Sequence, residues 1–156
     1  MWYSYIVEEK TVATNREARR DYHIFENFEA GIELKGTEVK SLREGRASLK
    51  DSFGRLEKNE VFVYNIYIPP YSHGNINNTE PKRRRKLLLH RAEIKKLVGQ
   101  VSQRGFTLVP IKLYFKHGLA KVDLALAKGK KLYDKREAIK EKTAERELRR
   151  AFKNVR

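Results

Sequence analysis

The fold is decided by the stretch Phe106-Thr-Leu-Val-Pro-Ile-Lys-Leu-Tyr-Phe-Lys-His-Gly-Leu-Ala-Lys-Val-Asp-Leu-Ala-Leu-Ala127. Apolar and polar side chains alternate in both halves of this stretch, which predicts strands over 106–115 and 119–127 around a turn at 116–118. One face of the first strand would carry Val109, Ile111, Leu113 and Phe115, opposite Val122, Leu124 and Leu126. A β-hairpin therefore closes the globular part of the chain.

The sequence upstream of this hairpin predicts several more short elements. Alternating patterns indicate strands over 21–26, 28–35 and 61–68 and a weaker one over 47–56, with a hairpin turn at Lys58-Asn59. Asn15 is placed to cap a short helix over 15–20, and a single helical turn is expected over 37–42. Ile94, Leu97, Val98 and Val101 recur at helical spacing and predict an amphipathic helix of about 12 to 14 residues that ends before Gly105.

Short antiparallel strands with a few short helices between them define the expected fold class. We predict a mainly β fold, an OB-like antiparallel β-barrel, because closure removes the exposed edges that many short strands would leave. An open α+β sheet is the alternative, and periodicity does not separate the two.

Length and composition limit the class of protein. The 156 residues fit one domain with an appendage, and the absence of Cys excludes disulfides and thiolate metal sites. The N-terminus lacks the basic start and apolar run of a secretory signal, and no apolar segment is long enough to span a bilayer. We therefore expect a cytoplasmic protein with no membrane partner.

Charge points to a polyanionic partner and divides the chain. The net charge is +15, of which residues 128–156 carry +7 from twelve Lys or Arg and five Asp or Glu. That segment has too little apolar bulk to form a core, so we expect a body over 1–127 and a solvated or partner-bound tail over 128–156. Basic residues spread over several elements favour nucleic acid over a membrane surface as the partner.

Candidate RNA-binding residues lie in the body. Five consecutive cations, Lys82 to Lys86, repel one another and are more stable against phosphate, which makes Arg83, Arg84, Arg85 and Lys86 candidates for phosphate contacts. Lys112, Tyr114 and Lys116 share the outer face of a predicted strand and could hold phosphates and stack on a base, although a plain solvated face explains them equally well. Glu29 could orient cations or accept hydrogen bonds from base edges or 2′-hydroxyls.

The sequence offers little for catalysis. The four His residues are scattered without metal-ligand spacing, and no nucleophile elbow or glycine-rich phosphate loop is present. A ribonuclease using His73 and His117 as acid and base remains conceivable only because spatial neighbours need not be sequence neighbours. We expect a protein that is not an enzyme and has no metal, cofactor or small-molecule substrate.

Several blocks of sequence, in order, resemble the signature motifs of the small protein B (SmpB) family of bacteria. The blocks are Asn15-Arg-Glu-Ala-Arg, Phe28-Glu-Ala-Gly-Ile, Lys35-Gly-Thr-Glu-Val-Lys-Ser-Leu-Arg43, Arg85-Lys-Leu-Leu-Leu-His90 and Ala127-Lys-Gly-Lys-Lys-Leu-Tyr-Asp-Lys-Arg136. The resemblance implies an OB-like barrel that binds the tRNA-like domain of transfer-messenger RNA and stands in for its missing anticodon arm. It also implies delivery to stalled ribosomes, where the tail, disordered when free, becomes helical in the decoding centre and mRNA channel.

The resemblance carries over to particular residues. It places Asn15, Arg16, Glu29 and Leu89 on the RNA-binding body and assigns a decoding-centre motif in the tail, namely Lys128, Gly129, Lys130, Lys131, Tyr133, Asp134, Lys135 and Arg136. Tyr133 is close to Lys131 and Lys135, so its ring could stack on a base while its neighbours hold phosphates. A general tRNA- or single-strand-binding OB module is the alternative function.

Overall fold

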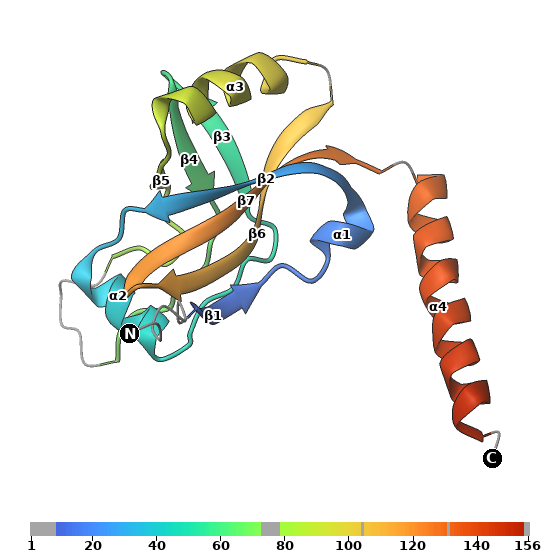
Figure 1. Cartoon of the computed structure of the whole chain (residues 1–156). Helices are drawn as coiled ribbons and strands as arrows, with labels where there is room; N and C mark the ends of the chain where they lie inside the picture. The colour runs from blue at the N-terminus through green and yellow to red at the C-terminus, as the bar shows by residue number, and fades with distance from the viewer. Residues whose placement is uncertain (1–8, 73–78, 104, 131, 155–156) are drawn as a thin grey trace, which may run out of the picture.

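The computed structural model describes residues 9–72, 79–103, 105–130 and 132–154. Its strands are β1 (Glu9–Thr14), β2 (Tyr22–Ile32), β3 (Phe53–Glu57), β4 (Glu60–Tyr64), β5 (Arg85–Leu88), β6 (Phe106–Lys116) and β7 (Leu119–Gly129). Its helices are α1 (Ala18–Asp21), α2 (Gly36–Arg43), α3 (Arg91–Val101) and α4 (Leu132–Asn154). Figure 1 shows a curved sheet with α2 and α3 near its ends and α4 standing clear of it.

The sheet closes on itself, which confirms the predicted OB-like barrel. The strand order is β1-β6-β3-β4-β5-β2-β7, and all pairs are antiparallel. Strand β7 also pairs with β6, so the six strands from β6 to β7 form a closed ring, and β1 is added to it beside β6. Closure between β3 and β6 depends on Gly54, which lies opposite Leu108. A Cβ at Gly54 would lie 2.8 Å from the Leu108 Cβ, so a larger residue would push the two strands apart.

The barrel core contains the apolar face of nearly every strand. Phe28, Ala30 and Ile32 point inward as predicted, and they pack with buried residues of β4 and β7. Leu42 of α2 and Leu97 of α3 are fully buried in the same core, so these helices cover the openings that a barrel leaves at its ends. The predicted amphipathic helix that carries Ile94, Leu97, Val98 and Val101 is confirmed as α3, with 11 residues.

The predicted face of β6 is wrong for half of the strand. Leu108 and Leu113 face the barrel core, whereas Val109 and Ile111 form a second cluster on the outer face with Ala125 and Ala127. A β-bulge between Pro110 and Lys112 shifts the register with β7 and so exchanges the faces of β6. Helix α1 covers this outer cluster through Ala18, which is almost fully buried.

Other sequence predictions were wrong at their boundaries. Strands β1 and β5 were not predicted, the two strands expected over 21–35 are the single strand β2, and the strand expected to reach residue 68 ends at Tyr64. The side-chain amide of Asn15 does not cap a helix but donates to the Pro110 carbonyl at 3.0 Å. The Lys58-Asn59 turn is confirmed, with φ of 50° and 62° at these residues, as a tight two-residue hairpin requires.

In the part of the chain that the structure describes, none of the helices is long and apolar enough to cross a membrane.

Candidate RNA-binding surfaces

Glu29 lies on the outer face of β2, in a network that fixes its carboxylate. Its Oε2 accepts a hydrogen bond from the Tyr114 hydroxyl at 2.5 Å, and Lys116 Nζ lies 3.2 Å from the same oxygen. The Tyr114 hydroxyl, followed by Lys116, outweighs desolvation and lowers the pKa of Glu29. The result is an ionised and oriented acceptor that remains 40% exposed, which suits hydrogen bonding to a ligand's N–H or O–H groups.

Tyr114 does not offer the stacking surface predicted from its strand position. Its ring is 4% exposed, and Lys112 Nζ lies 4.6 Å from the ring centroid. Burial and the bond to Glu29 raise the pKa of Tyr114, so its hydroxyl remains a proton donor. In this structure Tyr114 positions Glu29 and does not present a ring to a base, while Lys112 and Lys116 surround them as cations.

Asn15 and Arg16 lie at the junction of β1 and α1. The backbone N–H of Asn15 donates to the Ile111 carbonyl at 2.7 Å and its side chain donates to Pro110, so both groups tie the junction to the bulge in β6. Arg16 follows directly and is exposed. Asn15 thus sets the place from which Arg16 projects.

Arg85 does not fit the prediction that the whole basic run contacts phosphate, because it is buried. Its side chain is 0% exposed, and its guanidinium donates to Glu38 Oε2 at 2.7 Å and to the Ile66 carbonyl at 2.6 Å. Residues alternate inward and outward along β5, and Arg85 occupies an inward position. Burial lowers the pKa of Arg85, and Glu38 opposes this shift. Arg85 is therefore a structural residue whose charge is neutralised inside the protein.

Glu38 is the residue on which this ion cluster depends, and it was not predicted from the sequence. Its side chain is 3% exposed and also binds Arg83, at 2.5 Å from Nη2 to Oε1. Burial alone would raise the pKa of Glu38, but Arg83, the Lys35 backbone N–H and Arg85 together lower it. Glu38 has the position of a capping-box acid in α2, and that local pattern was the only available signal.

The cluster also holds the ends of the segment between β4 and β5. Ser41 donates to the Pro69 carbonyl at 2.7 Å, and Arg85 donates to the Pro81 carbonyl at 3.0 Å. Helix α2 thereby fixes where this segment leaves and re-enters the barrel. His73, named above as a conceivable catalytic residue, lies in 73–78, outside the described residues.

The outward members of the basic run are partly paired. Arg84 lies 2.6 Å from Glu57 and Lys86 lies 3.1 Å from Glu60, and the side chains of these cations are 51% and 33% exposed. Such exposed pairs contribute little to stability, because water and salt screen them. These two cations remain available to RNA, unlike Arg85.

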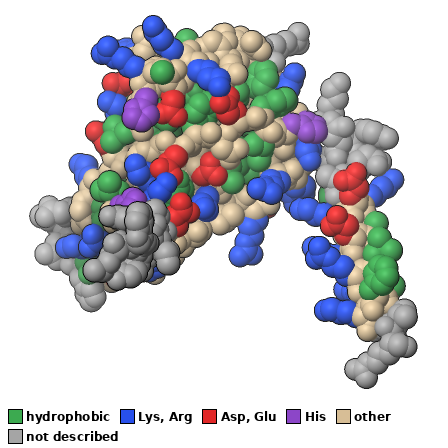
Figure 2. Space-filling view, viewed as in Figure 1, with side chains coloured by type: hydrophobic (Ala, Val, Ile, Leu, Met, Phe, Trp, Pro, Cys, Tyr) green, Lys and Arg blue, Asp and Glu red, His purple; other side chains and the backbone are tan. Residues whose placement is uncertain are grey.

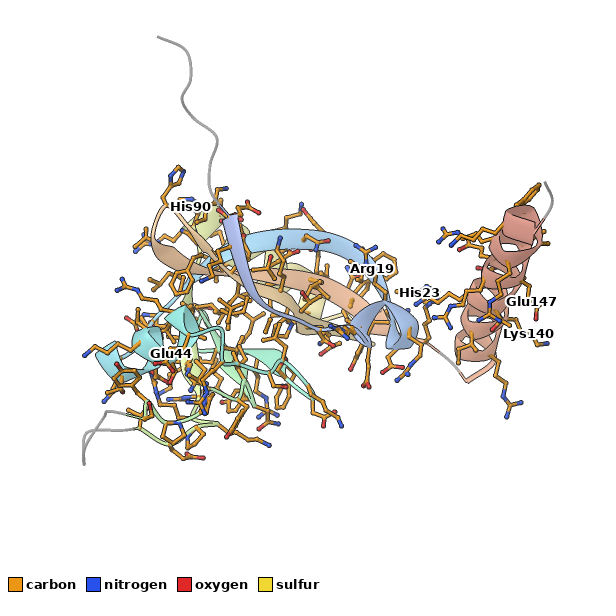
Figure 3. The ribbon with its side chains drawn as sticks, turned by 90° about the horizontal axis from the view of Figure 1, so that it is seen from below. Arg19, His23, Glu44, His90, Lys140 and Glu147 are labelled. Atoms are coloured by element: carbon orange, nitrogen blue, oxygen red, sulfur yellow. The ribbon has the colours of Figure 1, made fainter. Side chains whose placement is uncertain are left out.

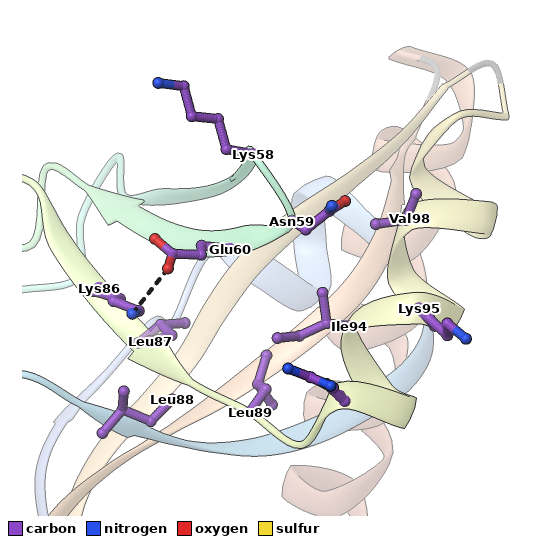
Figure 4. Close-up of a pocket in the computed structure, with 11 residues that line it drawn as sticks. Lys58, Asn59, Glu60, Lys86, Leu87, Leu88, Leu89, Ile94, Lys95 and Val98 are labelled. Carbon is purple, nitrogen blue, oxygen red and sulfur yellow. Dashed lines mark hydrogen bonds and ion pairs between the residues drawn. The ribbon is translucent and has the colours of Figure 1, made fainter.

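Leu89 lies in a groove between β5 and α3 (Figure 4). The groove has a volume of about 740 Å³ and an apolar floor that includes Leu88, Leu89, Ile94 and Val98. Leu88 is 49% exposed and Leu89 is half-buried against the core. Lys58, Lys86, Arg91 and Lys95 line the same groove, so an anionic ligand with an apolar part matches its chemistry.

The predicted tail motif begins inside the barrel. Strand β7 runs to Gly129, with Lys128 opposite both His23 and Phe106, and the Lys130 N–H donates to the Asp21 carbonyl at 2.9 Å. The barrel therefore extends to Lys130, three residues beyond the expected end of the body at residue 127. Figure 3 shows Arg19 and His23 at the end of the barrel nearest to α4, so the motif leaves the body beside further basic side chains.

The rest of the motif belongs to α4 or precedes it. Lys131 lies outside the described residues; Tyr133, Asp134 and Lys135 lie in α4, but the structure does not describe their side chains. Arg136 is exposed. From Ile139 to Lys153 every side chain is exposed, and Figure 2 shows the apolar side chains of α4 on one side and Lys and Arg on the other. The helical state expected for the tail is present, while its disorder in the free protein remains a prediction.

Among the described residues, no group of His, Asp and Glu side chains could hold a metal ion. His117 lies in the β6–β7 turn with φ 51°, and His23 and His90 lie near opposite ends of the barrel in Figure 3. The described His residues thus do not form one catalytic site.

A closed OB-like barrel with an oriented carboxylate, exposed cations and a basic helix defines a nucleic-acid-binding class of protein. The comparisons identify the family within that class: the SmpB protein family model matches residues 12–154, and the chain belongs to this family.

Similar proteins support this membership over most of the chain. An SsrA-binding protein of Halothermothrix orenii is 60% identical over 144 residues, which cover 92% of this chain and 93% of that one. An SsrA-binding protein of Caldicellulosiruptor bescii is 61% identical over 144 residues, covering 92% and 91%. A chain from the solved structure "tmRNA-SmpB: a journey to the center of the bacterial ribosome" is 52% identical, with a TM-score of 0.66, covering 85% of this chain and 94% of that one.

Proposed function

We propose that this protein is an RNA-binding adaptor required for trans-translation. It binds the tRNA-like domain of transfer-messenger RNA, takes the place of the missing anticodon arm and delivers the RNA to stalled ribosomes. The proposal rests on full-length similarity to SsrA-binding proteins, SsrA being transfer-messenger RNA, and to an SmpB chain named with the bacterial ribosome. Its partners are RNA and the ribosome, it acts in the cytoplasm, and it is not an enzyme.

The observation that carries the proposal is the fixed Glu29 carboxylate among cations. A carboxylate on the surface of a protein with net charge +15 repels phosphate, so it weakens binding unless it accepts a specific hydrogen bond. The Tyr114 hydroxyl holds it ionised and oriented, while Lys112 and Lys116 supply attraction for the backbone. This arrangement suits recognition of one folded RNA better than nonspecific binding.

The tail would act after RNA binding. Helix α4 presents Lys142, Arg146, Arg149, Arg150 and Lys153 on one side, which suits the phosphate-lined decoding centre and mRNA channel of the small subunit. The motif from Lys128 to Arg136 would set the position of this helix, because its first residues are anchored in β7.

The test is to identify the RNA that copurifies with the protein and to compete it with bulk tRNA. The adaptor should copurify with transfer-messenger RNA and retain it against excess tRNA, whereas a general tRNA- or single-strand-binding OB module would lose it. Intact RNA after incubation with the protein is expected, and cleavage products would support the ribonuclease alternative instead.

A further inference from the structure

The outer face of β3 and β4 carries a set of rings and cations that the predicted RNA-binding residues do not explain. Val61 and Val63 point inward and are fully buried, so Phe62 and Tyr64, which alternate with them, point outward, as do their cross-strand partners Arg55 and Phe53. We call this set the aromatic strip, which consists of Phe53, Arg55, Phe62, Tyr64 and Arg84. Only Arg84 was singled out from the sequence.

One end of the aromatic strip is a pair of stacked rings. Phe53 and Tyr64 are opposite each other in the β3–β4 pairing, with ring centroids 5.2 Å apart and planes within 8° of parallel. Tyr64 also donates its hydroxyl hydrogen to Glu57 Oε1. The hydrogen bond to Glu57 fixes the Tyr64 ring, and that ring supports one face of Phe53. Phe53 itself is 37% exposed.

The other end is a guanidinium lying on a ring. Arg84 Cζ is 4.3 Å from the centroid of Phe62, and Arg84 Nη1 donates to Glu57 Oε2 at 2.6 Å. The Tyr64 hydroxyl and Arg84 lower the pKa of Glu57, so this carboxylate stays charged and holds the guanidinium in place. The Arg84 side chain remains 51% exposed, so a second flat group can contact it.

The charge around the aromatic strip favours an anionic partner. Arg55 is exposed beside Phe62, and Lys58 and Lys86 extend the basic surface toward the groove of Leu89. The carboxylates on this face, Glu57 and Glu60, are already paired with Arg84 and Lys86. Cations therefore outnumber carboxylates on a face with two flat platforms.

The spacing of the platforms selects an unpaired strand. The two platforms rest on neighbouring rings: Arg84 lies over Phe62, and Phe53 stacks on Tyr64. Phe62 and Tyr64 are two residues apart on β4, so their Cα atoms are separated by about 6.8 Å. Bases in a helical strand stack about 3.4 Å apart, and neighbouring bases must separate before each can contact its own platform. A duplex cannot do this, because its bases are paired and stacked.

We propose that the aromatic strip is a second RNA-binding surface that takes unpaired nucleotides, with one base on Phe53, another on Arg84, and phosphates on Arg55 and Lys86. In the order of the closed ring, β3 lies opposite β2, which carries Glu29, so this surface points away from Glu29. The barrel can thus contact a folded RNA on one side and a single-stranded segment on the other. A protein partner is the competing occupant, but it would not need an excess of cations beside two stacking platforms.

The test uses a fluorescent dodecamer of uridine and the full-length protein with two conservative changes, Phe53→Leu and Arg84→Lys. Phe53→Leu keeps an apolar side chain and Arg84→Lys keeps the positive charge, but each change removes a flat surface. We expect the double variant to bind the oligonucleotide about tenfold or more weakly, because stacking is worth about 1 to 3 kcal/mol per base. The salt dependence of binding should stay the same, since no cation is lost.

Phe25→Leu with Arg43→Lys is the matched control. Phe25 is 59% exposed on β2 and Arg43 is exposed on α2, so the same changes are made away from the aromatic strip. This control should bind the dodecamer like the wild type. Circular dichroism checks folding, and Arg84→Lys alone, with a smaller expected loss, serves if the Phe53 change unfolds the barrel.

Either of two results in the dodecamer assay would overturn the proposal. One is unchanged dodecamer binding by the folded double variant; the other is equal weakening by the control. Photocrosslinking with RNA that contains 4-thiouridine should place adducts within residues 53–64. In a second experiment the protein is crosslinked to the ribosome through this face, and crosslinks to ribosomal proteins alone would show that the aromatic strip binds a protein partner instead. The oligonucleotide assay contains no transfer-messenger RNA, so its failure would leave the proposed function standing.

Discussion

The run Lys82–Lys86 and the tail over 128–156 are both strongly basic in sequence, yet the structure uses their charges in different ways. Arg83, Arg84, Arg85 and Lys86 all contact carboxylates, at 2.5 to 3.1 Å. These carboxylates are contributed by α2, β3 and β4, between 26 and 47 residues away in the chain. Helix α4 has exposed side chains from Ile139 to Lys153. A basic run in the sequence therefore does not show which of its cations are free to bind nucleic acid: Arg85 is buried against a carboxylate, whereas the partly exposed Arg84 and Lys86 remain accessible.

Deleting residues 131–156 should give the largest effect and separates the two regions most directly. The truncation follows Lys130 because β7 and the Lys130 backbone bond belong to the barrel. We expect binding to the tRNA-like domain and the thermal unfolding midpoint to stay nearly unchanged, because none of the α4 side chains that the structure describes belongs to either core cluster. Peptide tagging on stalled ribosomes in a reconstituted translation system should be abolished, with Tyr133→Ala giving a partial loss. Tagging by the truncated protein would show that the tail is dispensable.

Glu38→Ala should give the largest loss of stability from a single change. It would leave Arg85 buried without a counter-charge, and breaking such a pair costs about 3 to 5 kcal/mol. Chemical denaturation measures the free energy of unfolding. Glu60→Ala is the matched control, because it removes the partner of Lys86 at an exposed site and should cost less than about 1 kcal/mol. Similar losses from both changes would mean that burial does not distinguish these pairs.

The sequence predicted most strands of the barrel because alternation and turn signals are local, whereas closure was expected because it removes exposed edges. The β6–β7 hairpin, the Lys58-Asn59 turn and α3 all follow from residues close together in the chain. Strand β5 was missed because a basic run masks its alternation, and the inward Arg85 can be identified only once Glu38 is placed. The bulge near Pro110 moved Val109 to the outer face, and no periodicity rule anticipates one extra residue.

The candidate site was predicted in part for the same reason. Glu29, Lys112 and Tyr114 do lie together, but the sequence did not distinguish a ring that stacks on a base from a ring that orients a carboxylate. The aromatic strip was missed because its members come from three separate segments: β3, β4 and the residue before β5. Strand register, which depends on the whole barrel, decides these contacts.

Glu29→Ala should weaken binding to the tRNA-like domain by about 1 to 3 kcal/mol, because a hydrogen-bonded charge is lost. The effect on unfolding should be smaller, since the carboxylate is exposed. Tyr114→Phe keeps the ring and removes the hydroxyl that orients Glu29, so it should reproduce part of the binding loss. Glu33→Ala is the control at an exposed position following the same strand. A large loss of stability with intact binding would reassign Glu29 to the fold.

Acid should weaken the barrel through Glu38. The pKa of Glu38 is lower in the folded protein than its ordinary value of about 4.3. Its stabilising contribution is therefore fully present above the ordinary pKa and is lost as the pH falls through the lowered, folded-state pKa. Over this pH range the wild type should lose more free energy of unfolding than Glu38→Gln does. The extra loss is about 1.4 kcal/mol for each unit by which folding lowers the pKa of Glu38. Parallel curves would show that Glu38 does not contribute.

The smallest expected effect concerns the helix content of the free tail, which distinguishes the tail from the folded barrel. Ala144, Leu148, Ala151 and Phe152 form a narrow apolar stripe, with cations on the opposite side, and an isolated helix of this length is marginal in water. Repulsion among the cations should keep the free tail largely unfolded, so salt or bound RNA should increase its helix content. The circular dichroism difference between the full-length and truncated proteins measures this. Ala144→Gly should lower the helix content further, by about 1 kcal/mol in local stability. A difference spectrum already fully helical at low salt would show instead that the tail is preformed, like the barrel.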